Sequence, residues 1–181
     1  MVSDQEVIVH TKSWIEQVII GENFCPFAAL PFRKDQIRYW ILKGNAAETH
    51  LEILVRELEY LAHHLNIETS VLIIPKALSD FEAYLEFLDL ANSLLVEQGY
   101  EGIFQIASFH PDYQFAGTDY EDAANFTNRS PYPLLHLLRE ESVSKAVEAH
   151  SNTEEIPNRN IDHARKLGTS HFEDILQKIM D

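Results

Sequence analysis

Cysteine is nearly absent from this sequence of 181 residues, which contains only Cys25. A single cysteine excludes an intramolecular disulfide and any metal site built from several thiolates. The N-terminal stretch has acidic residues before its apolar part, whereas a secretory signal has a basic start and a continuous apolar core. Both features suit a reducing compartment, and we expect the protein to be cytoplasmic.

Long apolar runs and basic residues are also scarce. No run approaches the roughly 18 apolar residues that a transmembrane helix needs, so we expect no membrane span. Lys and Arg number 14 against 29 Asp and Glu, which gives a formal net charge of -15. This charge opposes attraction to phosphate backbones and to anionic membranes. We therefore expect neither nucleic acid nor a membrane as a partner.

Neither internal repeats nor low-complexity linkers interrupt the chain. Its length lies within the range of one compact domain, and a hydrophobic content of 45% is typical of a globular protein. We therefore expect residues 1–181 to form a single domain, and the order of the predicted elements makes it an α/β domain.

Apolar periodicity and turn residues predict strands separated by helices. A first helix is expected from Asp4 to Ile20, where apolar residues recur at helical spacing. One helix joins each later pair of strands, which is the pattern of right-handed parallel crossovers. The sequence thus predicts a layered α/β sandwich with a small, mainly parallel three-stranded sheet flanked by helices. The later elements are expected as strands at Gln36 to Leu42, Ser70 to Ile74 and Gly102 to Phe109, and as helices at Ala46 to Leu65, Ser79 to Gln98 and Pro133 to Ala149, with weaker helices near Asn160 to Leu167 and Ser170 to Met180.

Polar side chains gather in the stretch from Phe104 to Ser142, which contains several carboxylates together with His, Arg and Asn residues. In a parallel sheet, ligands bind beyond the carboxyl ends of the strands. The last predicted strand ends just before His110, so this polar stretch begins at the expected edge. We therefore place the candidate site here.

His110 and Asp112 follow this strand, with Pro111 between them. Two such side chains can face one pocket, with His110 as general acid or base and Asp112 as its orienting carboxylate, or with both as metal ligands. Loop His and Asp residues also commonly hydrogen-bond a turn. The spacing leaves these interpretations open.

His136 and Glu140 are four residues apart on a predicted helix and would share one face. They are candidates for a second acid–base pair, or for ligands of a divalent metal that His110 or Asp112 would complete. A local hydrogen bond, or an ion pair with the adjacent Arg139, is the alternative. The identity of a metal, and whether one is bound, is left open.

Arg129, Ser130 and Arg139 are the candidate anion-binding residues. Ser130 can cap the predicted helix that follows it, and the free N–H groups and dipole of a helix start favour an anion. Arg129 can add a bidentate contact to a carboxylate or phosphate. In the alternative, Ser130 only caps its helix and Arg129 pairs with a nearby carboxylate.

Cys25 lies between Phe24 and Phe27, just after the first predicted helix. A short helix starting at Pro26 would lower the pKa of the thiol, and the thiolate could then act as a nucleophile with a histidine as base. A lone cysteine between aromatic residues is more commonly a small core residue. We favour this second interpretation.

The segments NFCPFA, QIASFHPDYQFAGT and NFTNRSPYPLLHLLREESV, together with the later IPNRN, resemble the bacterial family catalogued as domain of unknown function 1415. The resemblance extends from about Trp14 to Leu167. It implies a cytoplasmic bacterial protein of this length and brings no assigned activity, substrate or cofactor. The matching positions are therefore candidates on physical grounds alone, and they are Cys25, His110, Asp112, Arg129, His136, Arg139 and Glu140.

The leading hypothesis is a small cytosolic enzyme that acts on an anionic metabolite. In this hypothesis Arg129 and the helix start at Ser130 hold the anion, and the histidines with their carboxylates carry acid–base chemistry. The alternative is a noncatalytic module that binds a small ligand, a metal or a partner with the same polar cluster. A third interpretation makes the cluster an internally hydrogen-bonded loop. Enzymatic activity, cofactors and oligomeric state are left open by the sequence.

Overall fold

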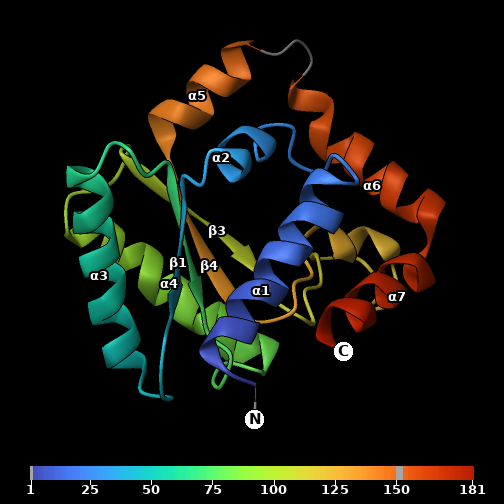
Figure 1. Cartoon of the computed structure of the whole chain (residues 1–181), viewed down its shortest axis with the longest axis horizontal. Coiled ribbons are helices and arrows are strands. Elements are labelled where there is room, and N and C mark those ends of the chain that lie inside the picture. Colours follow the sequence, from blue (N-terminus) through green and yellow to red (C-terminus); the bar gives the residue numbers. More distant parts are fainter. Residues whose placement is uncertain (1, 150–152) are drawn as a thin grey trace.

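The computed structural model describes residues 2–149 and 153–181. A sheet lies between two groups of helices (Figure 1). No helix in the described residues is long and apolar enough to cross a membrane. In chain order the elements are α1 (Asp4–Trp14), η1 (Ile15–Ile20), α2 (Ala29–Arg33), β1 (Ile37–Ile41), α3 (Ala47–His63), β2 (Thr69–Ile73), α4 (Phe81–Glu97), β3 (Phe104–Phe109), η2 (Ala123–Thr127), β4 (Leu134–Arg139), α5 (Glu140–Ala149), η3 (Thr153–Glu155), α6 (Ile156–Leu167) and α7 (Thr169–Met180).

Four strands form one mixed sheet in the order β1-β2-β4-β3. β1 and β2 are parallel, whereas β4 is antiparallel to both β2 and β3. The three predicted strands therefore run in one direction, and β4 is inserted between the second and the third. The α/β class is confirmed, but the expectation of a three-stranded, mainly parallel sheet is wrong.

β4 is the element for which the sequence predicts the start of a helix. The helix expected from Pro133 to Ala149 is instead strand β4 followed by helix α5. β4 lies between two other strands, and Leu134, Leu135 and Leu137 are all buried. A strand whose two faces both meet apolar neighbours is a nearly continuous apolar run, which periodicity cannot distinguish from a helix segment.

Different helices pack on the two faces of the sheet. α3 and α4 pack on one side, which we call the α3/α4 face, and its core includes Leu72 and Leu135. α1, η1 and α7 lie over the other side, which we call the α1 face, and its core includes Val71, Leu134 and Phe172. Because strand side chains alternate between faces, consecutive residues of β4 belong to different cores.

Local signals in the sequence set the helix ends. Ser3 and Glu6 form a capping box at the start of α1, in which each side chain accepts the backbone N–H of the other residue. α1 continues into the π-helical η1, so the first predicted helix is confirmed. The helix expected from Ser79 begins at Phe81, and its N-cap is Asp80, whose side chain accepts the Ala83 N–H at 2.9 Å.

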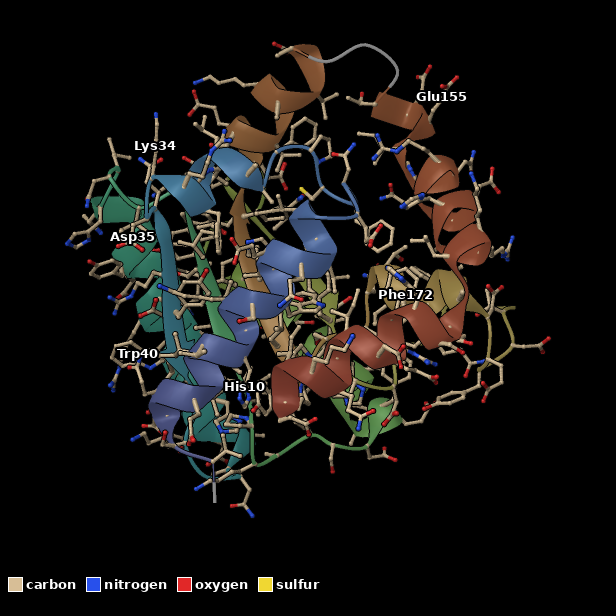
Figure 2. The ribbon with its side chains drawn as sticks, turned by 45° about the vertical axis from the view of Figure 1, so that its right-hand side comes forward. His10, Lys34, Asp35, Trp40, Glu155 and Phe172 are labelled. Carbon is tan, nitrogen blue, oxygen red and sulfur yellow. The ribbon has the colours of Figure 1, made fainter. Side chains whose placement is uncertain are left out.

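A buried ion pair fastens the edge strand β1 to α3. Arg38 donates to the carboxylate of Glu57 through Nε and Nη2 at 2.9 to 3.2 Å, and Ser70 of β2 donates to it at 3.2 Å. The Glu57 side chain is only 5% exposed, so its charge depends on these partners. The guanidinium also lies over the rings of Trp40 and Tyr60. Trp40 marks the outer edge of the sheet (Figure 2).

Arg38→Ala should destabilise the fold, because it leaves the buried Glu57 carboxylate without its cation. Removing one partner of a buried ion pair costs about 3 kcal/mol. Urea unfolding followed by circular dichroism measures this loss in the free energy of unfolding. The double substitution Arg38→Met with Glu57→Leu removes both charges and should cost less, so a loss equal to that of Arg38→Ala would contradict the account.

Candidate functional site

His110 lies one residue beyond β3 and is fully buried. Its Nε2 is 2.9 Å from the Leu78 carbonyl oxygen, and its Nδ1 accepts the Asp112 backbone N–H at 3.0 Å. This arrangement requires a neutral ring that donates through Nε2, and burial lowers the pKa of His110 from its ordinary value. The ring packs against Phe81 and Tyr84 of α4. Backbone groups therefore occupy both ring nitrogens.

Asp112 contributes its backbone, and not its carboxylate, to His110. Asp112 is exposed, and its carboxylate accepts a hydrogen bond from the Tyr120 hydroxyl at 2.8 Å. This hydrogen bond raises the pKa of Tyr120. The predicted pairing of His110 with an orienting carboxylate is therefore replaced by a bond between Asp112 and Tyr120.

Arg129 is buried, with 6% of its surface exposed. Its Nε donates to the Tyr113 carbonyl oxygen at 3.1 Å, and its Nη2 donates to the Tyr120 carbonyl oxygen at 2.7 Å. The guanidinium also lies over the rings of Tyr120 and Phe126. Arg129 thus joins two ends of one loop, and anion binding by this residue stays a prediction.

Ser130 does not begin a helix. Its hydroxyl donates to the Tyr132 carbonyl oxygen at 2.6 Å, and the residues that follow lead into β4. The helix start predicted at Ser130 is therefore wrong. The free N–H groups that it would have offered to an anion are lost with it.

Asn125 is a buried polar residue that the sequence analysis missed. Its Oδ1 accepts the Phe115 N–H and the Thr118 hydroxyl, and its Nδ2 donates to two backbone carbonyl oxygens of the same loop. The available signal was a polar residue among the apolar residues of η2. Together with Arg129, Asn125 makes the loop of residues 113–122 internally hydrogen-bonded, which is the geometry of the third interpretation.

His136, Arg139 and Glu140 do not share a helix face. His136 belongs to β4, Arg139 ends that strand, and Glu140 begins α5. Arg139 donates through Nη2 to the carbonyl oxygens of Leu61 and Ile67 at 2.6 and 2.9 Å, so its charge lies at the carboxyl end of α3, where the helix dipole favours a cation. Across a strand and a helix, four-residue spacing does not align two side chains, so the predicted His136 and Glu140 pair is wrong.

His110 and His136 lie on opposite faces of the sheet. His110 packs against α4, whereas His136 is in register with Val71 and Ala107 and lies on the α1 face, with its ring 6.4 Å from that of Phe109. Among the described residues, no group of three or more His, Cys, Asp or Glu could hold a metal ion. His136 and Glu140 therefore do not share a site with the other predicted members, His110, Asp112 and Arg129, which do lie close together.

A cavity of about 850 Å³ lies on the α1 face beside His136. Ala107 of β3 and Leu138 of β4 are half-buried and form part of its floor. Residues 24–31, α5 and α6 form its walls, and α2, α5 and α6 lie together at one end of the molecule (Figure 1). Most of the residues that line the cavity are apolar.

The cavity reaches the edge at which the sequence places a ligand, where Phe109 and Asn128 line it, and it extends from there to the opposite edge of the sheet. Ile37, Thr69 and Gln105 line the cavity and lie at the amino ends of β1, β2 and β3. At the carboxyl end of β3, Trp14 of α1 packs edge-on against Phe109, with ring centroids 5.1 Å apart. Trp14 and Phe109 both line the cavity, so α1 borders the cavity at this end, and the amino ends of the strands border it at the other.

His136 is the polar residue in the cavity floor that lacks a partner. Its side chain is half-buried, and its Nε2 is buried without a hydrogen-bond partner among the described residues. Burial lowers the pKa of His136 to about 4, so the ring is neutral at pH 7. An unpaired buried polar atom costs free energy, and a turn of the ring about χ2 that brings a nitrogen to a group bound in the cavity would recover it.

Cys25 also lines the cavity and is half-buried. Burial raises the pKa of its thiol, and hydrogen bonds from the backbone of Phe27 and Ala28 only partly oppose this shift. The thiol is therefore protonated at neutral pH. Its packing against the α1 face core agrees with the favoured interpretation of a small core residue.

Glu22 joins the end of η1 to the two C-terminal helices. Its carboxylate lies 2.9 Å from Nε2 of His163 in α6 and 2.7 Å from Nε2 of His171 in α7. Burial raises the pKa of Glu22, but the bonds to the two histidines outweigh it and hold the pKa below its ordinary value. The sequence does not predict this cluster, because the two histidines lie 141 and 149 residues from Glu22 along the chain.

α6 is also tied to the segment that carries Cys25. Asn160 donates to the Phe24 carbonyl oxygen at 2.7 Å, and Arg159 donates to that of Asn23 at 2.6 Å. In Figure 2, α6 lies between the labelled residues Glu155 and Phe172. The motif IPNRN thus holds the motif NFCPF beside the cavity.

The chain matches the family model described as "Protein of unknown function (DUF1415)" over residues 6–174. The resemblance seen in the sequence is therefore confirmed. Neither a curated protein nor a solved structure matches the chain. The matched residues include the cavity and the loop that Arg129 holds.

Arg129→Ala should release the loop of residues 113–122 and lower the free energy of unfolding by about 2 to 4 kcal/mol, because two carbonyl oxygens lose a charged donor. Amide hydrogen exchange in this loop should rise with it. Arg165→Ala is the control, since it removes an exposed ion pair to Asp122 and should cost less than about 1 kcal/mol. Stabilisation of the wild type by millimolar phosphate that disappears in Arg129→Ala would instead support anion binding.

Proposed function

Because the chain belongs to the DUF1415 family, whose description assigns no activity, we propose its function from the geometry of the cavity, namely the binding of a small, mainly apolar molecule. The observation that carries the proposal is the apolar cavity of about 850 Å³ on the α1 face. Small-molecule sites typically measure about 300–1,000 Å³ and combine apolar walls with a few polar groups. The cavity fits this description in both size and lining.

Apolar side chains around the cavity remain partly exposed to solvent. Leu138 and Phe109 are half-buried on the sheet, and Leu30 of α2 is 53% exposed. Water contact with such groups is unfavourable, and a ligand in the cavity would remove it. This cost supports an occupant that is itself mainly apolar.

α5 supports the same proposal. The helix leaves the sheet directly after β4, and none of its described side chains is buried. Val143 nevertheless turns towards the cavity as part of its lining. An amphipathic helix is normally stabilised by burying its apolar face. A bound molecule would bury more of this face.

An enzyme that acts on an anionic metabolite is the second candidate. Cys25 and His136 line the same cavity, so a nucleophile and a base are available in principle. Burial raises the pKa of the thiol and lowers that of the imidazole, so the resting pair is uncharged and the thiol is a weak nucleophile. We therefore place ligand binding first, and we retain a cytoplasmic location as part of the proposal.

Filling the cavity tests the proposal. Ala107→Trp places a large ring on the cavity floor and should weaken the binding of Nile red, an uncharged solvatochromic dye, at least tenfold. Ile103→Trp adds the same ring at a position that is 51% exposed and outside the cavity lining, so it should leave the dissociation constant within about twofold of the wild type. Fluorescence titration measures both constants, and circular dichroism checks that both variants fold. Equal binding by all three proteins would place the dye elsewhere and contradict the proposal.

A further inference from the structure

We propose that the molecule bound in the cavity is uncharged and that its hydroxyl or carbonyl group hydrogen-bonds to His136. The inference rests on the proposed function, because it names the chemical class of ligand for the same cavity. It departs from the anionic metabolite expected from the sequence. Three features of the site carry it, namely the engaged cations, the charge at the rim and the unpaired imidazole.

The guanidinium of Arg139, which lines the cavity, already donates hydrogen bonds to the protein backbone. Arg139 lines the cavity, but its Nη2 donates to backbone carbonyl oxygens at the end of α3, on the other side of the sheet. Arg129 is buried in its own loop, where two carbonyl oxygens and two aromatic rings surround it. Binding an anion with either residue would break hydrogen bonds that hold the fold.

The charge at the rim also disfavours an anion. Lys145 of α5 lines the cavity, but its Nζ is 2.5 Å from a carboxylate oxygen of Glu141. Glu68 lines the cavity too and adds a second negative charge near Lys145. The chain as a whole carries a formal charge of -15. A carboxylate or phosphate would therefore enter an apolar space in which the described residues offer no free counter-ion, which is costly.

His136 matches an uncharged polar group. A neutral imidazole has one N–H donor and one acceptor, as a hydroxyl group does, and it can also donate to a carbonyl oxygen. Its Nε2 has no partner among the described residues, and burial keeps the ring neutral at pH 7. The torsion χ2 of histidine has broad, roughly two-fold minima, so rotation of the ring can turn either edge towards a ligand. One hydrogen bond in an apolar site then selects for a single polar group.

Four eight-carbon probes that differ at one end test the inference. Octane, 1-octanol, octanoate and octylammonium compete with Nile red at pH 7.5 in the wild type, His136→Leu and His136→Gln. The wild type should bind octanol about three- to tenfold more tightly than octane, which is the effect of one hydrogen bond. It should bind octanoate at least tenfold more weakly than octanol. Octylammonium should be weaker by a similar factor, because its ammonium group loses its hydration in the apolar space.

The His136 variants separate a hydrogen bond from simple packing. His136→Leu should bind octane as the wild type does and lose the preference for octanol. Its melting temperature should not fall, because the substitution removes an unpaired polar atom from an apolar site. His136→Gln keeps a donor and an acceptor and should retain part of the preference, so it also serves if His136→Leu folds poorly.

The outcomes distinguish this inference from the proposed function. Tightest binding of octanoate or octylammonium would overturn the claim that the ligand is uncharged. Equal affinity for octane and octanol in the wild type, or an unchanged preference in His136→Leu, would overturn the role of His136 while leaving the apolar site intact. If neither the dye nor any probe binds the wild type, the proposed function fails first.

Discussion

Backbone hydrogen bonds from β4 to both β2 and β3 are the constraint on which the rest of the structure depends. They set a register in which alternate residues of β4 face opposite sides of the sheet. Leu135 and Leu137 then join the core beneath α3 and α4, and Arg139 reaches the end of α3. His136 falls between them and faces the cavity. A slip of one residue would exchange these roles, because it would turn every side chain of β4 to the other face.

The cavity exists because helices cover the two faces of the sheet to different extents. Two long helices, α3 and α4, bury the α3/α4 face, whereas α1, η1 and α7 cover only part of the α1 face. On the rest of that face, α5, α6 and residues 24–31 border a space of about 850 Å³. The unpaired Nε2 of His136 and the half-buried Leu138 are consistent with a space that a ligand completes.

The sequence was sufficient for elements with a clear period, such as α1, the three strands of one direction and the helices between them. It failed at β4, where LLHLLR reads as helix or as a doubly buried strand, and this error displaced His136, Glu140 and the cap at Ser130. His136 was therefore selected for the wrong partners. The sequence could not predict contacts such as the hydrogen bond from Asn160 to Phe24, because only the tertiary fold brings these residues together.

Nitrogen-15 NMR of the histidine side chains tests the central claim most directly, because it reports on each imidazole as ligand is added. In uniformly labelled protein at pH 7.5, saturation with 1-octanol should shift the ring nitrogens of His136, whose Nε2 lacks a partner, and leave those of His110, which are bonded to Leu78 and Asp112, unchanged. The His136→Gln variant assigns the resonance. Unchanged His136 nitrogens at saturation, or a shift confined to His110, would contradict the account.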